Sequence, residues 1–475
     1  MNTTPTDATE EFLEGLRNAL PEGRLRPVDP GYLEEPRGRA RGRAAALLLP
    51  RSTEEVSTIL AACNEAGVAV IPYSGGTGLV GGQVSGEGPL PVLLSLEKMD
   101  RIREVDPAGG VLVAEGGTIL ATVQEAAAEV GLLFPLSLAS EGSARIGGLL
   151  ATNAGGINVI RYGNTRDLVL GVEAVLADGT VIRGLSSLRK DNTGYDLRHL
   201  LIGSEGTLGV ITAASLRLFP RPAEIATAFA AVPDPAAAVA LLGRMREAAG
   251  DSISAFEIMS SEGFAFLEET GLAPRPPVED PGDWCVLIEL GGRGVSRTLE
   301  EALATAFEAG EVTDGALAQN ETQRKAMWDV RETIPEANRL IGSVGSHDIS
   351  IPVARIPDFM KEGAQAVSAL DESLRINAFG HLGDGNLHYN VFPARGRARS
   401  DYDQVKGAVQ DAIHDLVQAH GGSISAEHGI GRFKAHDLAR RADAGKLAAM
   451  HAIKAALDPR GILNPGAVLA TRRPG

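Results

Sequence analysis

The stretch Pro72-Tyr73-Ser74-Gly75-Gly76-Thr77-Gly78-Leu79-Val80-Gly81-Gly82 decides how the first half of this 475-residue chain folds. It follows Val68-Ala69-Val70-Ile71, an apolar run typical of a buried strand. Its glycines match G-x-G-x-x-G, but a dinucleotide-binding Rossmann fold needs a helix that opens at the third glycine. The next residues, Gln83-Val84-Ser85-Gly86-Glu87-Gly88-Pro89, are unsuited to a helix interior. We therefore reject a nicotinamide-type fold and expect a nest of backbone N–H groups for a pyrophosphate, with a plain glycine turn as the alternative.

Two further glycine-rich tracts follow in the same half of the chain, at 141–156 and 203–212. Short apolar runs between the first two tracts predict strands at 91–95, 102–105 and 111–114. Glycine lets a backbone pass close to a ligand because it has no Cβ atom. Three such tracts indicate a backbone that lies closely along a long, phosphate-bearing cofactor.

One helix near the N-terminus can be delimited from its end signals. Ser52 and Glu55 form a capping box, and Gly67 is suited to end the helix. Apolar residues recur at helical spacing between them, at Val56, Ile59, Leu60 and Cys63. We expect Cys63 to face the core and to be unreactive.

A second decisive stretch is Ala378–Asn390, with the sequence AFGHLGDGNLHYN. Asp384-Gly385 favours a two-residue hairpin turn, since glycine tolerates the positive φ that such a turn requires. With that turn, His381 would lie directly opposite His388, with Cβ atoms about 5 Å apart. Two imidazoles at this separation can hold one metal ion. The alternative is a polar hairpin with both histidines on its solvent-exposed face.

The segment Ser425-Ala426-Glu427-His428-Gly429 supplies the remaining groups of a catalytic site. Glu427 offers a third ligand, and two histidines with one carboxylate leave positions open for a substrate. His428 is a candidate base because the intrinsic pKa of histidine lies near neutral pH. Adjacent residues of a strand point to opposite faces, so this interpretation requires an irregular backbone at 427–428.

Composition limits the classes of partner. The net charge of −16 argues against nucleic acid or an anionic membrane as the main partner. Two cysteines, Cys63 and Cys285, are too few for a disulfide framework or an iron–sulfur cluster. We see neither a signal peptide nor an apolar run long enough to span a bilayer, so we expect a cytoplasmic protein that does not span the membrane. A homodimer is left open.

The chain changes character after Pro220-Arg221-Pro222, where we expect a domain boundary. The predicted domains are 1–221, 222–430 and 431–475. Strands at 252–259 and 284–290, the hairpin and a helix at 405–420 favour an α+β domain with an antiparallel sheet in the second half. His414 and His420 on that helix are expected at the surface.

These motifs together resemble the FAD-linked D-2-hydroxyacid dehydrogenases of the vanillyl-alcohol oxidase/p-cresol methylhydroxylase superfamily. The match covers about residues 35 to 470 and includes the three tracts, GHLGDGNLH, AEHG and Asn464-Pro465-Gly466. The resemblance implies an α+β chain with a two-part FAD-binding domain, an α+β cap domain, and a C-terminal segment that returns to the FAD domain. It implies oxidation of a small-molecule D-2-hydroxy acid, with electrons passed to an external acceptor.

The resemblance also assigns cofactor contacts. The first tract would contact the FAD pyrophosphate through Gly75, Gly76, Thr77 and Gly78. The second would hold the flavin and ribityl region through Gly142, Ser143, Gly147, Gly148, Thr152 and Asn153. Glu205 and Ile211 would reach the adenosine side, and Asn464 would lie near the isoalloxazine. No histidine occurs in the three tracts, so we expect non-covalent FAD.

In the second half we expect a divalent metal held by His381, His388 and Glu427, with zinc as the first choice and iron or manganese also open. Arg331 matches the arginine of a W-x-x-R-E segment and would bind the substrate carboxylate. An exposed salt bridge is the alternative for Arg331. Asn390 would contact the substrate, and His428 would act as base.

The distal end of the substrate can be judged by the same resemblance. Relatives that prefer D-2-hydroxyglutarate use a threonine and a lysine there, and a gap-free alignment from Arg331 puts Pro335 and Ser346 in their places. Neither carries a charge, so we expect a monocarboxylate such as D-lactate, with D-2-hydroxyglutarate kept as an alternative through His347. A non-redox flavoprotein resembling the alkylglycerone-phosphate synthases and a binding module with a structural flavin are the other hypotheses.

Overall fold

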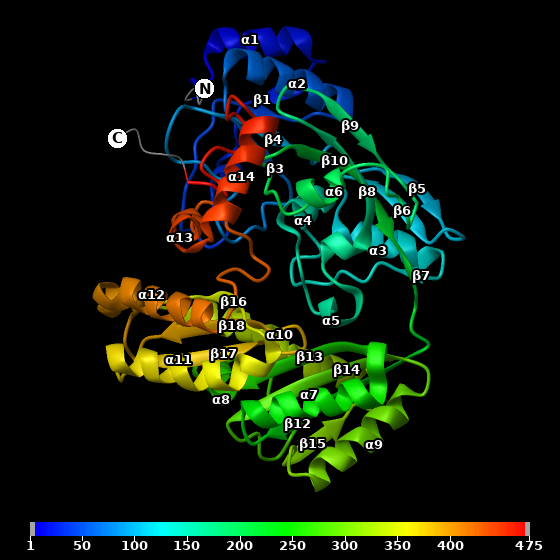
Figure 1. The fold of residues 1–475 in the computed structure, drawn as a ribbon, viewed down its shortest axis with the longest axis vertical. Helices are drawn as coiled ribbons and strands as arrows, with labels where there is room; N and C mark the ends of the chain where they lie inside the picture. Colours follow the sequence, from blue (N-terminus) through cyan, green and yellow to red (C-terminus); the bar gives the residue numbers. More distant parts are fainter. Residues whose placement is uncertain (1–4, 273, 471–475) are drawn as a thin grey trace. The chain divides into compact units, whose positions relative to one another are not determined.

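The computed structural model describes residues 5–272 and 274–470, and the chain divides into two compact units (Figure 1). Unit 1 comprises Met1–Gly156, Gly163–Arg221 and His428–Gly475. Unit 2 comprises Ile157–Tyr162 and Pro222–Glu427. Nothing in the sequence indicated that 157–162 would belong to unit 2, since these residues directly follow the second glycine-rich tract.

Unit 1 begins with a four-stranded sheet in the order β1-β2-β4-β3. Its strands are β1 (Leu25–Arg26), β2 (Leu47–Leu48), β3 (Val70–Tyr73) and β4 (Val92–Ser95). Helices α1 (Glu10–Ala19) and α2 (Thr53–Ala66) pack beside it. The signals for α2 are confirmed: Ser52 accepts the Glu55 N–H, and Gly67 ends the helix in the left-handed region at φ 71°. Cys63 is fully buried, which raises the pKa of its thiol.

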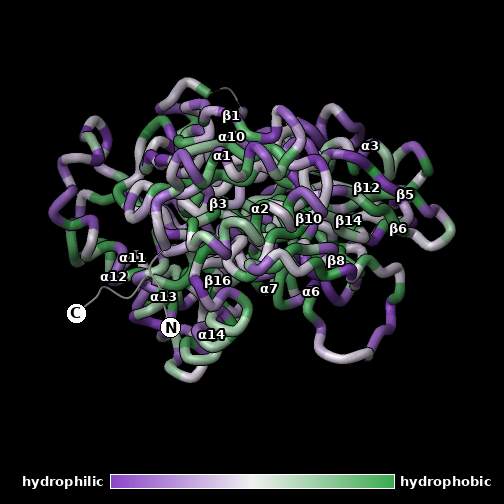
Figure 2. The backbone as a smooth tube through the Cα atoms, turned by 90° about the horizontal axis from the view of Figure 1, so that it is seen from above, coloured by the Kyte–Doolittle hydropathy of each residue, from purple (hydrophilic) through white to green (hydrophobic). Residues whose placement is uncertain are grey.

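A five-stranded antiparallel sheet, β5-β6-β10-β8-β9, forms the second part of unit 1. Its strands are β5 (Ile102–Asp106), β6 (Val111–Glu115), β8 (Val169–Val175), β9 (Val181–Gly184) and β10 (Val210–Arg217). A small pair is formed by β7 (Leu132–Leu133) and β11 (Phe219–Pro220). The helices are α3 (Leu120–Glu129), α4 (Ile146–Thr152), α6 (Leu197–Leu201), α13 (Ala435–Arg441) and α14 (Ala444–Leu457). The loop between β9 and α6 is largely exposed, and Figure 2 draws it mainly in purple and white.

Unit 2 is built on a seven-stranded antiparallel sheet, β15-β12-β14-β13-β17-β18-β16. Its strands are β12 (Glu224–Val232), β13 (Ile253–Ser260), β14 (Trp284–Gly292), β15 (Asp314–Leu317), β16 (Asp348–Ser350), β17 (Arg375–His381) and β18 (Asn386–Phe392). The helices are α5 (Val159–Tyr162), α7 (Pro235–Ala249), α8 (Ser261–Glu269), α9 (Val295–Glu308), α10 (Glu321–Ile341), α11 (Ile356–Leu370) and α12 (Asp403–Ala419).

Alternation along the strands of unit 2 gives each face of the sheet its own core. On β12, Ala228 and Ala230 pack into the core under α7, α9, α11 and α12 (Figure 1). Phe229 and Ala231 pack into the other core, which α8 and α10 cover. The candidate site residues of this unit lie on the face that α8 and α10 cover, because Phe379 of β17 belongs to that core.

The expectation that His414 lies at the surface is wrong. Its side chain is buried on α12, where Ile413 and Val417 pack into the core, and its Nε2 lies 3.4 Å from His347 Nδ1. A buried imidazole is tolerated there because it meets another polar ring. His420 lies at the end of the same helix, with its Nε2 3.1 Å from Glu362 Oε2.

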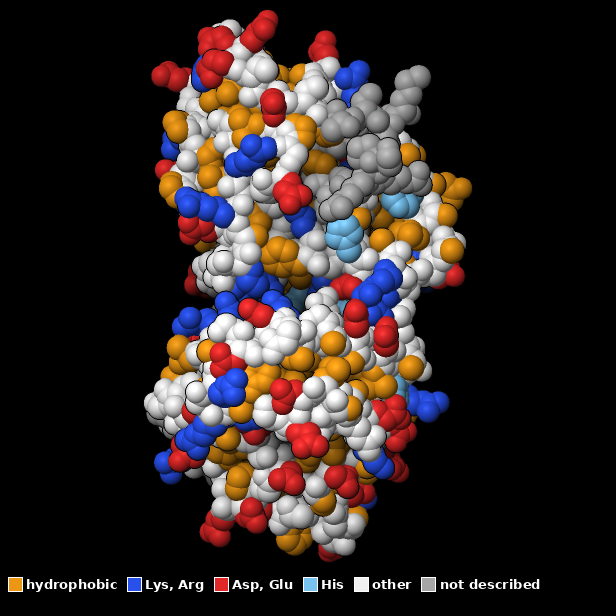
Figure 3. All heavy atoms as spheres, turned by 90° about the vertical axis from the view of Figure 1, so that its left-hand side faces the viewer, with side chains coloured by type: hydrophobic (Ala, Val, Ile, Leu, Met, Phe, Trp, Pro, Cys, Tyr) orange, Lys and Arg blue, Asp and Glu red, His pale blue; other side chains and the backbone are white. Residues whose placement is uncertain are grey.

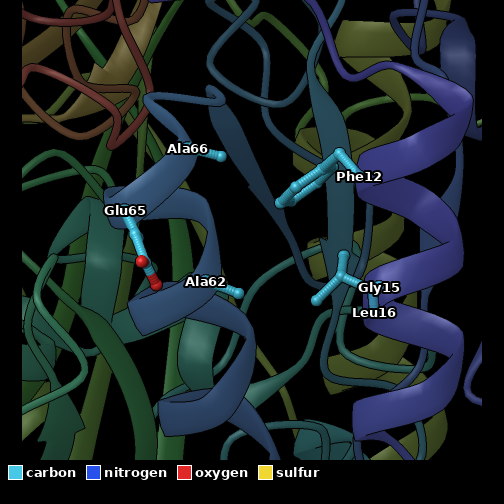
Figure 4. Close-up of a pocket in the computed structure, with 6 residues that line it drawn as sticks. All are labelled: Phe12, Gly15, Leu16, Ala62, Glu65 and Ala66. Carbon is cyan, nitrogen blue, oxygen red and sulfur yellow. The ribbon is translucent and has the colours of Figure 1, made fainter.

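The surface carries charges of both signs. Acidic and basic side chains are interspersed over the face shown in Figure 3, although acidic residues exceed basic ones by 61 to 45 in the whole chain. Within the described residues, no helix is both long enough and apolar enough to cross a bilayer. A hollow between α1 and α2 is lined by Phe12, Gly15, Leu16, Ala62, Glu65 and Ala66 (Figure 4). No candidate site residue lines this hollow.

Candidate active site

The histidine hairpin forms, but its expected register is wrong. Phe379, not His381, lies opposite His388, and Leu382–Gly385 joins the two strands. The loop is wider than two residues because the N–H of Gly383 donates to a carbonyl of β13, at Phe256. The slip is two residues, which keeps both histidines on one face since side chains alternate along a strand. Their ring centroids lie 5.8 Å apart.

One carboxylate faces the Nε2 atoms of both histidines. Glu427 Oε1 lies 3.9 Å from His381 Nε2 and 3.6 Å from His388 Nε2. Two donors on one tetrahedral zinc, each about 2.0–2.2 Å from the ion, lie roughly 3.3–3.6 Å apart. The distance from Glu427 Oε1 to His388 Nε2 falls at the upper end of that range, and the distance to His381 Nε2 is a few tenths of an ångström longer. Glu427 lies in a loop rather than a strand, so the backbone is irregular where the sequence required it.

The other ring nitrogen of each histidine faces a buried carboxylate. His381 Nδ1 lies 2.6 Å from Glu257 Oε1, and His388 Nδ1 lies 3.9 Å from Asp348 Oδ1. Each carboxylate lies directly opposite its histidine on the neighbouring strand, β13 or β16. A proton on Nδ1, directed at a carboxylate, leaves Nε2 available to a metal ion. Sequence reasoning missed both acids, because only the register of the sheet pairs them with the histidines.

Asp348 also holds Glu427, the third candidate ligand, in place. Its Oδ2 accepts the backbone N–H of Glu427 at 3.1 Å, and its Oδ1 accepts Asn386 Nδ2 at 2.9 Å. Potential ligand atoms of Asp348, His388, Glu427 and His428 all lie within 4.8 Å of one another, a group that does not include His381. The donor set, two imidazoles and carboxylates, is chemically suited to zinc, iron or manganese.

Glu257 and His381 polarise each other. Burial raises the pKa of Glu257, but the positive His381 and Arg331 outweigh it and lower the pKa to about 2. Burial lowers the pKa of His381, but the Glu257 carboxylate outweighs it and raises the pKa to about 9.

Arg331 of α10 is 6% exposed and contacts the same carboxylate. Its Nε donates to Glu257 Oε2 at 2.6 Å, and its guanidinium carbon lies 4.8 Å from the centroid of the Phe379 ring. Its terminal nitrogens donate to no residue within the described part of the chain. An exposed salt bridge does not describe this arginine, because both it and its partner are buried. Its two terminal nitrogens can take a planar carboxylate.

Unit 2 also holds Asn390, a predicted substrate contact, and the two positions that the sequence placed at the distal end of the substrate, Pro335 and Ser346. Asn390 lies two residues after His388 on β18, and its Oδ1 accepts the His347 N–H at 3.1 Å. Pro335 is exposed within α10, one turn beyond Arg331. Ser346 is exposed, and its Oγ lies 2.7 Å from Ser343 Oγ.

In unit 1 the first glycine-rich tract presents a row of unpaired donors. None of the backbone N–H groups of Gly75–Leu79 donates a hydrogen bond to any residue in the described ranges. Gly76 has φ 70°, and Gln83 Nε2 holds the turn by donating to Gly78 O at 2.8 Å. Successive N–H groups in such a turn form an anion-binding concavity. This row fits a pyrophosphate.

The three tracts meet along α4. Ser74 Oγ in the first tract accepts the N–H of Gly148 in the second at 3.0 Å. A Cβ atom on Gly75 would lie 2.5 Å from the backbone oxygen of Ser143. The N–H of Glu205 in the third tract donates to Ala151 O at 2.8 Å. Glycine is thus required at position 75 because one tract crosses another there.

Several residues assigned to the cofactor bind the protein itself. Thr152 Oγ1 donates to Gly148 O at 3.0 Å, and Asn153 Oδ1 accepts the Arg166 N–H at 2.9 Å. Ile211 is buried within β10 at 4% exposure. Gly142 has open space where a Cβ would lie, whereas one on Gly147 would lie 3.0 Å from Gly116 O.

Glu205 and Asn464 anchor the segment that starts at His428. The Glu205 carboxylate accepts the N–H groups of Ile430 and Gly431 at 2.7 and 2.8 Å. Asn464 Nδ2 donates to Glu205 O at 2.8 Å, and its Oδ1 accepts Arg432 Nη2 at 2.7 Å. Burial raises the pKa of Glu205, and the two backbone N–H groups oppose that rise. The polar side-chain atoms of Glu205 and Asn464 therefore already form hydrogen bonds with other residues of the protein.

Arg432 extends this network to the first tract, and sequence reasoning missed it. Its Nη1 donates to Gly82 O at 2.8 Å and to Gly81 O at 3.0 Å. Burial lowers the pKa of Arg432 to about 10, against the pull of Glu205. Hydrogen bonds therefore join the first tract, the third tract and the segment that starts at His428.

Comparisons with known proteins found two families that match this chain. A family described as "FAD binding domain" matches residues 44–184, and one described as "FAD linked oxidases, C-terminal domain" matches residues 221–468. The mitochondrial D-2-hydroxyglutarate dehydrogenase of Bos taurus is 40% identical over 473 residues, which cover 98% of this chain and 84% of that protein. A putative mitochondrial D-lactate dehydrogenase of Schizosaccharomyces pombe is 34% identical over 95% of this chain and 87% of its own.

Among solved structures, p-cresol methylhydroxylase with substrate bound superimposes with a TM-score of 0.77 at 18% identity, over 99% of this chain and 100% of its own. At that identity the likeness concerns the fold, and it confirms the expected fold class. The expected cytoplasmic location is wrong, because the relatives from cattle and fission yeast are named as mitochondrial proteins.

Proposed function

We propose, from the premise that this chain belongs to the FAD-linked D-2-hydroxyacid dehydrogenases of the vanillyl-alcohol oxidase/p-cresol methylhydroxylase superfamily, a metal-assisted oxidation of a D-2-hydroxymonocarboxylate. The chain is thus an oxidoreductase that acts on D-2-hydroxy acids. The observation that carries the metal-assisted form is the convergence of His381 Nε2, His388 Nε2 and Glu427 Oε1.

Each candidate residue has a separate role in the proposed reaction. Bound FAD supplies the hydride acceptor, and a divalent ion at the three ligands supplies a Lewis acid for the substrate hydroxyl. Arg331 holds the substrate carboxylate with its two terminal nitrogens, and Asn390 orients the substrate. His428, the residue after Glu427, takes the hydroxyl proton as the 2-oxo acid forms.

The cofactor is proposed to be non-covalent FAD, with its pyrophosphate on the N–H row of Gly75–Leu79. Acid denaturation should release intact FAD into the supernatant. Flavin that stays with the precipitated protein would contradict this part of the proposal. The electrons then pass to an external acceptor, since the two cysteines are too few to hold an iron–sulfur cluster.

The preference for a monocarboxylate rests on Pro335 and Ser346. Proline has no side-chain donor, and the Ser346 hydroxyl is neutral and already meets Ser343. A second buried substrate carboxylate without a cation would cost binding free energy. The relatives' names support a second candidate, D-2-hydroxyglutarate, because the relative from cattle carries that substrate in its name.

Two measurements test the proposal. Anaerobic addition of D-lactate should bleach the flavin, and steady-state kinetics should give D-lactate a higher kcat/KM than D-2-hydroxyglutarate. The reverse order would favour the second candidate, and no bleaching by any D-2-hydroxy acid would favour a non-redox flavoprotein.

The metal is tested with a pair of histidine variants. His388→Ala should lose the metal and most turnover while keeping FAD. His420→Ala is the matched control, because His420 contacts Glu362 rather than the candidate ligands, and it should keep both. Fully active wild-type protein that holds no metal by elemental analysis would contradict the metal site.

A further inference from the structure

We propose that Glu257 is a positioning residue that sets the orientation of both the metal-binding His381 and the carboxylate-binding Arg331. The inference rests on the proposed function, since it concerns the two residues to which that function assigns the metal and the substrate carboxylate.

The geometry places Glu257 between these two residues. Glu257 is fully buried on β13 and lies directly opposite His381 on β17. Its Oε1 lies 2.6 Å from His381 Nδ1, and its Oε2 lies 2.6 Å from Arg331 Nε. Each oxygen therefore has one partner, and each partner is a candidate site residue.

Only a carboxylate can serve both partners. His381 Nδ1–H and Arg331 Nε–H are both donors in the proposed state, so the residue between them must accept twice through separate oxygens. A glutamine has one amide oxygen, and its NH₂ group would face one of the two donors. If the NH₂ faced His381, Nδ1 would become the acceptor and the ring proton would move to Nε2. That tautomer removes the nitrogen that the metal needs.

A neighbouring glutamate shows what a purely structural role would look like. Glu289 on β14 is also buried, and it accepts from Arg324 of α10 at 2.8 Å and from Trp328 Nε1 at 2.8 Å. It thus anchors the same helix through an arginine one heptad earlier. None of its partners is a candidate site residue, so Glu289 provides a matched control for the loss of a buried carboxylate.

The orientation that Glu257 imposes has two measurable effects. Loss of an acceptor behind a metal-binding histidine typically weakens metal binding roughly 10- to 100-fold. A guanidinium that has lost its Nε partner no longer presents its terminal nitrogens in one place, so KM for the hydroxy acid should rise about tenfold or more. Both changes should occur in the same variant, because one side chain holds both partners.

The experiment compares Glu257→Gln with Glu289→Gln as FAD-loaded full-length proteins. Zinc affinity is measured by chelator competition, FAD content by absorbance, and kcat and KM with D-lactate. We expect Glu257→Gln to bind zinc 10- to 100-fold more weakly and to show a raised KM, with FAD content near that of the wild type. Glu289→Gln should lower the melting temperature comparably while it keeps the zinc affinity and KM of the wild type.

Equal zinc affinity and equal KM in the two glutamine variants would overturn the inference. If Glu257→Gln does not fold, Glu257→Asp carries the test, since it keeps two acceptors on a shorter stem and should give an intermediate zinc affinity. An aspartate variant with wild-type affinity and KM would also overturn it. Wild-type protein that binds no zinc would instead refute the metal site itself, which separates the two failures.

Discussion

Replacement of Glu205 by glutamine should weaken unit 1 where the first tract, the third tract and the segment that starts at His428 meet. Glu205 is 9% exposed, and its two oxygens accept the N–H groups of Ile430 and Gly431 at 2.7 and 2.8 Å. Glutamine keeps one acceptor and turns an NH₂ group toward the other N–H. A buried donor left without a partner costs about 1–3 kcal/mol. The free energy of unfolding of unit 1 should fall by that amount.

Two further substitutions at the same position check the reasoning. Glu205→Ala removes both acceptors, so its cost should exceed that of Glu205→Gln. Glu205 has φ 52°, in the left-handed region where a residue with a Cβ pays roughly 1–2 kcal/mol relative to glycine. The free energy of unfolding of the Glu205→Gly variant should therefore exceed that of the Glu205→Ala variant by about 1 kcal/mol, although glycine has no side chain.

The assay is urea unfolding of the FAD-loaded protein, followed by flavin fluorescence and by circular dichroism. Because the anchored residues lie two and three positions after His428, kcat should fall together with the stability of unit 1. Glu205→Gln protein with an unchanged unfolding midpoint and unchanged kcat would refute the view that this carboxylate holds the returning segment. An alanine variant more stable than the glycine variant would refute the backbone argument.

Three other predictions follow from single contacts. Burial raises the pKa of Glu115, but hydrogen bonds from Arg101 outweigh it and lower the pKa below its usual value of 4.5. The ionised Glu115 therefore stabilises the folded protein above pH 4.5, and this stabilisation is lost as the pH falls through the pKa of the folded state. Glu115→Gln should therefore show a shallower loss of melting temperature below about pH 4.5 than the wild type, and an equally steep loss would contradict this. Gly75→Ala would place its Cβ 2.5 Å from Ser143 O, so FAD affinity should drop at least about tenfold in a fluorescence titration; unchanged affinity would show that the tract can shift. Pro335→Thr should raise kcat/KM for D-2-hydroxyglutarate relative to D-lactate, and an unchanged ratio would show that residue 335 does not face the substrate.

Local signals located helix ends and loops well. The limits of α2 follow from Ser52, Glu55 and Gly67, because a capping box and a left-handed glycine act on the backbone next to them. The rejection of a Rossmann fold followed from the residues after Gly81, and that segment is indeed a loop. Each of these inferences depends on residues within one or two turns of each other.

Strand register and contacts between residues far apart in the sequence could not be predicted from such local signals. Asp384-Gly385 favours a two-residue turn, but a hydrogen bond from Gly383 to β13 widens the loop and shifts the register by two. Glu257 lies 124 residues from His381, and no local pattern links them. The candidate ligand triad was predictable because its members stand in short motifs. The carboxylates behind it were not, because they depend on how β13, β17, β18 and β16 align.

The two histidines differ in how firmly the protein holds them. His381 has a dedicated partner in Glu257 at 2.6 Å, in a direct cross-strand pair. His388 faces Asp348 at 3.9 Å, and Asp348 also accepts from Asn386 and from the backbone of Glu427. A shared carboxylate farther away fixes a ring less tightly than one dedicated to it. His381 is therefore the candidate ligand whose ring the protein holds more firmly, while Asp348 accepts the backbone N–H of Glu427 and faces His388 at a longer distance.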